Sequence, residues 1–151
     1  LRSYSDEVRA QTIAAIKRIT HGLGMAAGLP EDKMPVVTLK DEFTPATYND
    51  PVLTKRLNGV FEDWLGKEAV LPGFPVMGGE DFGHFGRTQE KVPICMFWLG
   101  AVRKDTFRAS IASGQPLPSL HSPLFAPDPE PTIKTGVIGM TAAVLELTTN
   151  K

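Results

Sequence analysis

Apolar side chains recur every three or four residues in three stretches of the chain, which is the spacing of one face of an α-helix. The stretches cover residues 5–27, residues 50–65 and the chain from about residue 131. The first begins with a serine cap followed by acids and the second with an aspartate cap followed by proline, and glycine stops both. We therefore predict three helices. Their apolar faces are Val8, Ile16, Ile19, Leu23 and Ala26; Leu53, Leu57, Val60, Phe61 and Trp64; and Ile133, Val137, Met140 and Val144.

Three other segments have the pattern of β-strands. Apolar and polar residues alternate over residues 37–43, and short apolar runs cover residues 69–71 and 92–99. Residues 103–119 are rich in Ser, Gly, Pro and charge without a period, which predicts a long surface loop. Helices mixed with strands predict an α/β fold. Residues 1–43 hold too little to close a core of their own, so we expect partner strands before Leu1.

Composition narrows the class of protein. The 151 residues are 42% apolar and carry 16 Lys plus Arg against 17 Asp plus Glu. A net charge of −1 favours neither a nucleic-acid surface nor an acidic tail, so small molecules are the expected partners. Cys95, alone of its type, lies in an apolar run and is expected to be buried in a strand. No bilayer-length apolar run or signal peptide is visible, so we expect a soluble protein, with cytoplasm and periplasm both left open.

Chemistry-bearing residues concentrate in two places. The first, here called the glycine–acid stretch (residues 77–85), holds three glycines, two acids and His84 and is expected to run into a helix. Adjacent glycines allow a ligand close to the backbone, so this stretch reads as the rim of a site. The second is His121 with Ser122 and Pro123, where the proline restricts the residue before it. We expect the two places to be neighbours in space.

These motifs resemble one family. Gly78-Gly79-Glu80-Asp81-Phe82, Leu120-His121-Ser122-Pro123 and Thr135-Gly136-Val137 occur in this order, and Leu1-Arg2-Ser3-Tyr4 precedes Asp6-Glu7-Val8-Arg9. The set resembles the metal-dependent amidohydrolases of the hippurate hydrolase and indole-acetyl-amino-acid hydrolase branch of the aminoacylase and carboxypeptidase G-like metallopeptidases. The likeness covers the whole chain, which corresponds to less than half of a full-length member.

The resemblance implies roles for four residues. His121 matches the histidine that closes the two-metal site of the family; the alternative is a buried histidine bonded to backbone. Arg2 matches a lid arginine that grips the substrate carboxylate; the alternative is a solvated surface arginine. Gly79 and Glu80 match a turn whose backbone donors face the substrate; the alternative is a plain helix cap. Some relatives carry Thr at the position of Glu80. Asp81 is expected to cap a helix or to accept a hydrogen bond behind the ligands, and not to bind a metal itself.

The resemblance also implies an architecture. Residues 1–43 would finish a small α+β lid domain that makes a homodimer, and residues 44–151 would finish a zinc-peptidase-like α/β catalytic domain. The expected reaction is hydrolysis of an N-acyl amino acid or small peptide amide with two divalent ions, zinc or manganese. No catalytic residue of the family lies in this chain, so the chain alone is expected to be inactive.

Two other functions stay open from the residues themselves. An interaction or dimerisation module without catalysis would follow from an exposed sheet edge that pairs with another chain. A metal-free hydrolase would use Glu80 or Asp81 with His121 as an acid–base pair, although no serine or cysteine sits in a nucleophile motif.

Overall fold

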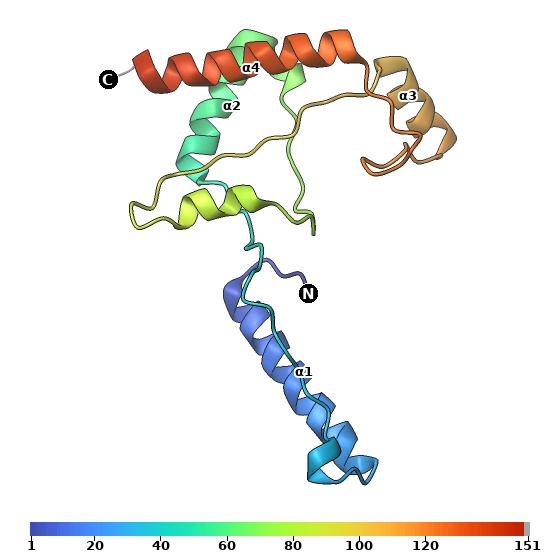
Figure 1. Cartoon of the computed structure of the whole chain (residues 1–151). Coiled ribbons are helices and arrows are strands. Elements are labelled where there is room, and N and C mark those ends of the chain that lie inside the picture. The colour runs from blue at the N-terminus through green and yellow to red at the C-terminus, as the bar shows by residue number, and fades with distance from the viewer. Residues whose placement is uncertain (150–151) are drawn as a thin grey trace. The chain divides into compact units, whose positions relative to one another are not determined.

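The computed structural model describes residues 1–149, which form two compact units (Figure 1). The first unit is Leu1–Asp50 with Phe74–Cys95, and the second is Pro51–Gly73 with the chain from Met96 onward. The glycine–acid stretch therefore packs in the same unit as residues 1–50. The expected domain boundary at residue 43 remains a prediction, because it concerns the architecture of the family and not the compactness of this chain.

The first unit is built on α1 (Asp6–Ala26), close to the predicted span of residues 5–27. The Ser5 hydroxyl accepts a hydrogen bond from the Val8 N–H at 3.2 Å, and acids fill the first turn, where the helix dipole favours them. At the other end Gly28 has a φ of 70°, and the Leu29 N–H donates to the Gly24 carbonyl at 3.1 Å. This is the left-handed glycine stop that ends many helices, so the prediction is confirmed at both ends.

After α1 the chain turns through the short 3₁₀ helix η1 (Glu31–Lys33). It then returns along α1 (Figure 1). Gly24 is buried where Pro35 crosses, because a Cβ at Gly24 would lie 2.8 Å from the Pro35 Cδ. Nearer the start of α1, the Arg9 guanidinium lies over the Phe43 ring, 4.0 Å from its centroid. Two contacts thus hold the returning segment against one helix.

The second unit is organised by the packing of α2 (Pro51–Leu65) against α4 (Pro129–Thr149). Small residues let the helices approach: Ala142 is 1% exposed, and a Cβ on Gly139 would lie 3.9 Å from the Phe61 ring. The Phe61 ring in turn packs on Phe97 at 4.9 Å between centroids. Arg56 on α2 donates to the Glu146 carboxylate on α4 at 2.8 Å. Both predicted helices are confirmed, and α4 begins two residues earlier than expected.

The predicted strands are not found. Residues 37–43, 71 and 92–99 belong to no helix or strand, residue 69 lies in the 3₁₀ helix η2 (Lys67–Ala69), and residues 1–149 contain no β-strand. An extended segment becomes a strand only through a ladder of backbone hydrogen bonds to a neighbour. The Ile94 carbonyl accepts one such bond from the Asp50 N–H at 2.8 Å, but no ladder forms in the described part of the chain. The α/β description is therefore not confirmed. Cys95 is half-buried and not in a strand.

The long loop predicted for residues 103–119 is wrong in its first part, which forms α3 (Lys104–Ser113). Gly114 ends this helix with a φ of 69°. Phe107 and Ile111 stand four residues apart on the helix and are both exposed. The sequence pattern does not predict this helix, because polar and charged residues dominate it and its apolar positions are too few to show a helical period. Arg103 and residues 114–119 lie outside the helix, as we predict.

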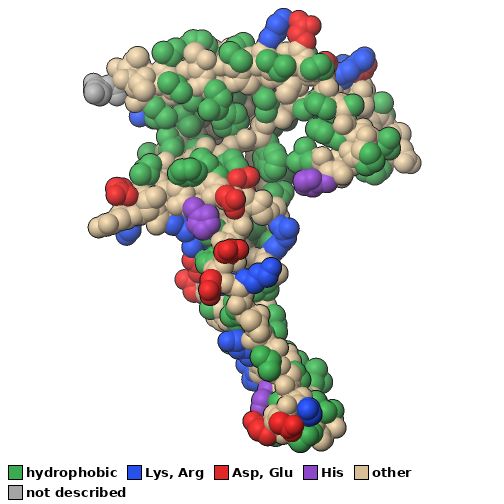
Figure 2. Space-filling view, viewed as in Figure 1, with side chains coloured by type: hydrophobic (Ala, Val, Ile, Leu, Met, Phe, Trp, Pro, Cys, Tyr) green, Lys and Arg blue, Asp and Glu red, His purple; other side chains and the backbone are tan. Residues whose placement is uncertain are grey.

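Apolar surface remains open on the helices (Figure 2). On α1, Ile16, Ile19 and Leu23 are exposed, although the periodic pattern marks them as a packing face. The buried apolar residues of the described chain are Leu57, Phe61, Ile94, Ala142 and Ala143. Within residues 1–149, no helix has both the length and the apolar character needed to cross a membrane.

Phe61→Ala should destabilise the second unit, because it removes the ring that fills the space between α2, α4 and Phe97. We expect a loss of about 3 kcal/mol in the free energy of unfolding. Urea unfolding followed by circular dichroism measures it. Val52→Ala, on the same helix but 78% exposed, is the control and should change stability by less than about 0.5 kcal/mol. Equal effects of the two substitutions would contradict the proposed core.

Candidate functional site

Arg2 and Gly79, both predicted to bind substrate, lie together in the first unit. The Arg2 Nη1 donates to the Met77 carbonyl at 2.6 Å, and a Cβ built on Gly79 would lie 3.4 Å from the same nitrogen. Among residues 1–149 this is the one hydrogen bond of the Arg2 guanidinium, and no carboxylate lies within ion-pair distance of it. The group is exposed. Its charge is thus held at the start of the glycine–acid stretch without an acidic partner.

Glu80 and Asp81 hold the following turn in place. The Glu80 carboxylate accepts the Phe82 N–H at 3.1 Å, which caps the 3₁₀ helix η3 (Asp81–Arg87). Asp81 accepts a hydrogen bond from the Thr44 hydroxyl at 3.2 Å, and the Thr47 hydroxyl donates to the Glu80 carbonyl at 3.4 Å. The expected helix through residue 85 is therefore a 3₁₀ helix. Binding of substrate by Gly79 and Glu80 remains a prediction.

Gly83 fixes η3 against the segment that carries these threonines. A Cβ at Gly83 would lie 2.9 Å from the Thr47 Oγ1 and 3.2 Å from the Ala46 carbonyl oxygen. The second neighbour is backbone, which cannot move aside cheaply. Only glycine therefore allows η3 to sit this close to residues 46–47. Phe82 and Phe85 pack on each other at 5.7 Å between ring centroids.

An ion pair joins the start of α1 to the end of η3. The Arg87 Nη1 and Nη2 donate to the two carboxylate oxygens of Asp6 at 2.7 and 3.2 Å, a two-pronged geometry typical of arginine. These hydrogen bonds lower the pKa of the Asp6 carboxyl, and the nearby charge of Arg9 adds to the effect. The sequence gives no local signal for this pair, because the residues are 81 positions apart.

His121, the predicted metal ligand, lies exposed in two consecutive turns of the second unit. The Ser122 N–H donates to the Ser119 carbonyl at 2.9 Å, which closes the turn that contains His121. The Ser122 hydroxyl then accepts the Leu124 N–H at 3.1 Å and so supports the turn at Pro123. The imidazole is thus not buried within the described chain, and the role of His121 as a metal ligand remains a prediction. That His121 neighbours the glycine–acid stretch remains a prediction.

A metal centre is not complete within the described chain. Residues 1–149 contain no group of three His, Cys, Asp or Glu side chains placed to hold an ion. His84, in the glycine–acid stretch, is exposed and has no predicted role. A catalytic zinc usually has three protein ligands, so His121 alone does not fit one.

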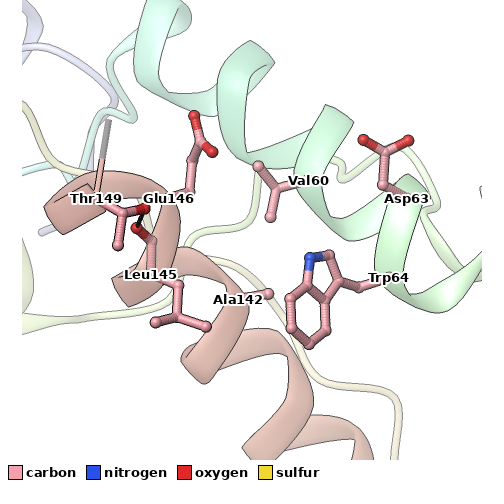
Figure 3. Close-up of a pocket in the computed structure, with 7 residues that line it drawn as sticks. All are labelled: Val60, Asp63, Trp64, Ala142, Leu145, Glu146 and Thr149. Carbon is pink, nitrogen blue, oxygen red and sulfur yellow. Dashed lines mark hydrogen bonds between the residues drawn. The ribbon is translucent and has the colours of Figure 1, made fainter. Parts of the chain in front are cut away.

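A groove in the second unit was missed by the sequence analysis (Figure 3). It lies between α2 and α4, holds about 230 Å³, and is lined mainly by Trp64, Asp63, Glu146 and apolar side chains. Trp64, which the sequence places on the apolar face of α2, is 55% exposed. The Glu146 carboxylate is already paired with Arg56. The adjacent residues Asp63 and Trp64, an acid next to an aromatic side chain, are the signal in the sequence that could have indicated this groove.

Comparison with known proteins identifies hydrolases. The model of peptidase family M20/M25/M40 matches residues 10–112. The uncharacterized hydrolase y4tI of Sinorhizobium fredii is 27% identical over 137 residues, which are 89% of this chain and 29% of the relative. An N-acetyldiaminopimelate deacetylase of Streptococcus thermophilus is 30% identical over 130 residues, which are 86% of this chain and 29% of the relative.

A shorter match involves a plant protein. The IAA-amino acid hydrolase ILR1-like 2 of Arabidopsis thaliana is 46% identical over 44 residues, which are 29% of this chain and 10% of the relative. No solved structure matches the chain at a significant level. The chain spans 29% of the length of the relatives from Sinorhizobium fredii and Streptococcus thermophilus.

Arg87→Gln should raise the pKa of the Asp6 carboxyl toward its ordinary value, because it removes the two hydrogen bonds to the carboxylate. A carboxyl whose pKa is lower in the folded than in the unfolded chain adds stability above about pH 4, and this stability is lost as the pH falls through the folded pKa. Carbon NMR titration of the aspartate carboxyls measures the change.

Arg103→Gln is the matched control, because Arg103 holds the pKa of Asp105 below its usual range through a hydrogen bond of 2.6 Å. This variant should raise the pKa of Asp105 and leave the titration of Asp6 alone. If the pKa of Asp6 is the same with and without Arg87, the two hydrogen bonds between Arg87 and Asp6 do not form in solution.

Proposed function

Because the chain belongs to peptidase family M20/M25/M40, a family of hydrolases, we propose that it is part of a metal-dependent amidohydrolase that cleaves the amide bond of N-acyl amino acids or small peptides. The observation that carries the proposal is the Arg2 guanidinium held beside Gly79 without an acidic partner. Two relatives are named for N-acylated amino acids, an IAA-amino acid hydrolase and an N-acetyldiaminopimelate deacetylase. Such molecules carry a carboxylate, which is the natural ligand of a free guanidinium.

Arg2 is suited to bind this carboxylate because most N–H groups of its guanidinium are not used within the described chain. One N–H group is used on the Met77 carbonyl, which anchors the side chain, and the remaining N–H groups can bind an anion in the two-pronged way. Arg56, Arg87 and Arg103 differ, because each is paired with an acid of this chain. The absence of a side chain on Gly79 leaves room beside the guanidinium for the substrate.

His121 is proposed as one ligand of a site for two divalent ions, zinc or manganese, whose other ligands come from beyond this chain. The turns around Ser122 hold the imidazole at the surface, where it can reach such a site. When bound, such ions polarise the substrate carbonyl and lower the pKa of a water molecule. The part of the reaction assigned to this chain is therefore binding and orientation, with no catalytic acid or base of its own.

Residues 1–43 are proposed to finish a lid domain and residues 44–151 a catalytic domain. Residues 37–43 and 92–99, which have the sequence pattern of strands, are proposed to pair in sheets of the longer protein. A homodimer through the lid is proposed as well, supported by the exposed apolar face of α1. The same face favours the second candidate, an interaction module without catalysis. The acid–base pair is disfavoured, because the Glu80 carboxylate already caps η3.

His121→Ala should remove one of the two divalent ions from the longer protein that contains this chain. Metal analysis after dialysis measures the stoichiometry, and His84→Ala, an exposed histidine without a proposed role, is the control. The 151-residue chain by itself should show no amide hydrolysis, since residues 1–149 hold no group of three side chains placed to bind an ion. Two ions retained by His121→Ala, or chelator-resistant turnover by the chain alone, would overturn the metal assignment.

Arg2→Ala in the longer protein should lower kcat/KM for N-acyl amino acids by roughly ten- to a hundredfold, because a charge-assisted hydrogen bond contributes about 1.5–3 kcal/mol. Arg2→Lys should recover only part of the loss. The matching C-terminal amides have no carboxylate and should be affected much less. Arg18→Ala, an exposed arginine of α1, is the control. Equal losses for acids and amides would make Arg2 structural.

A further inference from the structure

We infer that the Asp6–Arg87 ion pair is a positioning device for Arg2, which holds the start of α1 so that the Arg2 guanidinium stays beside Gly79. The last step, that a carboxylate binds there, rests on the proposed function. Asp6 and Arg87 would then be positioning residues that do not touch the substrate. None of the motifs that point to the family includes this pair as such.

Two contacts join the N-terminal residues of the chain to the stretch from Met77 to Arg87. Arg2 bonds to Met77 at 2.6 Å, and four residues later Asp6 bonds to Arg87 at 2.7 Å. Residues 1–5 belong to no helix or strand, so the first rigid point after Arg2 is the start of α1. Four residues span at most about 14 Å, so fixing Asp6 confines where Arg2 can reach. With one attachment lost, the segment can pivot about the other.

The position of η3 does not depend on the ion pair. Thr44 bonds to Asp81, Thr47 bonds to the Glu80 carbonyl, and Gly83 packs on the Ala46 backbone. These contacts keep the glycine–acid stretch in place when Arg87 is changed. The Arg9–Phe43 contact also still joins α1 to the segment that carries Thr44. Removing the pair should therefore loosen the residues before α1, with Arg2, and leave η3 in place, which separates positioning from a general loss of structure.

Exposure of the pair supports the same conclusion. The side chains of Asp6 and Arg87 are 58% and 38% exposed, and exposed ion pairs add little to the stability of a fold. Their two-pronged geometry instead defines a direction between two segments. Arg9, the other cation near Asp6, is held over the Phe43 ring one turn further along α1. Arg9 is thus not placed to replace Arg87 as the two-pronged partner of the Asp6 carboxylate.

The test compares Asp6→Asn, Arg87→Gln and the conservative Asp6→Glu in the isotope-labelled 151-residue chain. The readout is the nuclear Overhauser effect between the Arg2 side chain and the Gly79 α-protons. We expect it in the unmodified chain and in Asp6→Glu, and expect it to disappear in the other two variants. Contacts between the Phe82 and Phe85 rings should persist in all of them. Arg103→Gln, which breaks a different exposed pair, should change nothing here.

A second arm titrates each variant with N-benzoylglycine and with its amide. Binding falls in proportion to the fraction of molecules with Arg2 in place, so a tenfold loss of that fraction should weaken the acid about tenfold and the amide little.

The outcomes separate the two ideas. An Arg2–Gly79 contact that is absent from the unmodified chain, or that survives both Asp6→Asn and Arg87→Gln, overturns the positioning role. Loss of the contact in those variants supports positioning. In that case, N-benzoylglycine could still bind the unmodified chain no more tightly than it binds the Arg2→Ala variant. This result would mean that Arg2 does not bind the carboxylate, while the positioning role stands.

Discussion

The close contact between Gly83 and the Ala46 backbone is the constraint on which the candidate site of the first unit depends. Any larger residue would push η3 away from residues 46–47, since the nearest fixed atom would lie 3.2 Å from its Cβ. With glycine there, the hydroxyls of Thr44 and Thr47 reach Asp81 and the Glu80 carbonyl. The acids of the glycine–acid stretch are thereby used to build the turn, which leaves Arg2 as the group at its edge that is open to a ligand.

Three arginines near this turn have different surroundings, and the differences decide what each can do. Arg87 is neutralised by Asp6, and Arg9 lies over an aromatic ring. Arg2 donates to a neutral carbonyl, so its positive charge is not cancelled within the described chain. A charge held in place but not paired is suited to an anionic ligand, whereas a paired charge would have to break its own partner first.

Local signals predicted α1, α2 and α4, because caps, glycine stops and apolar spacing act within a few residues. They missed α3, which has few apolar positions to form a periodic face. The Ser5 cap and the Gly28 stop of α1 are examples. Strands need partners from elsewhere in the chain, so an extended pattern such as residues 92–99 does not by itself produce one. The Asp6–Arg87 pair likewise cannot be predicted from local sequence, because the two residues are 81 positions apart. Arg2 and Gly79 could be named together only through the resemblance to a family, and their contact is what the structure adds.

Arg2 and His121 differ in how much of their proposed site this chain contains. The anchor of Arg2 is complete within one unit, since Met77, Gly79 and the Asp6–Arg87 fork all belong to it. His121 is held by its own turns but has no second or third ligand among residues 1–149. Anion binding at Arg2 therefore depends on contacts that this chain already makes, whereas metal binding at His121 depends on groups that it does not supply. The two proposals can fail or succeed independently, because no residue is common to both.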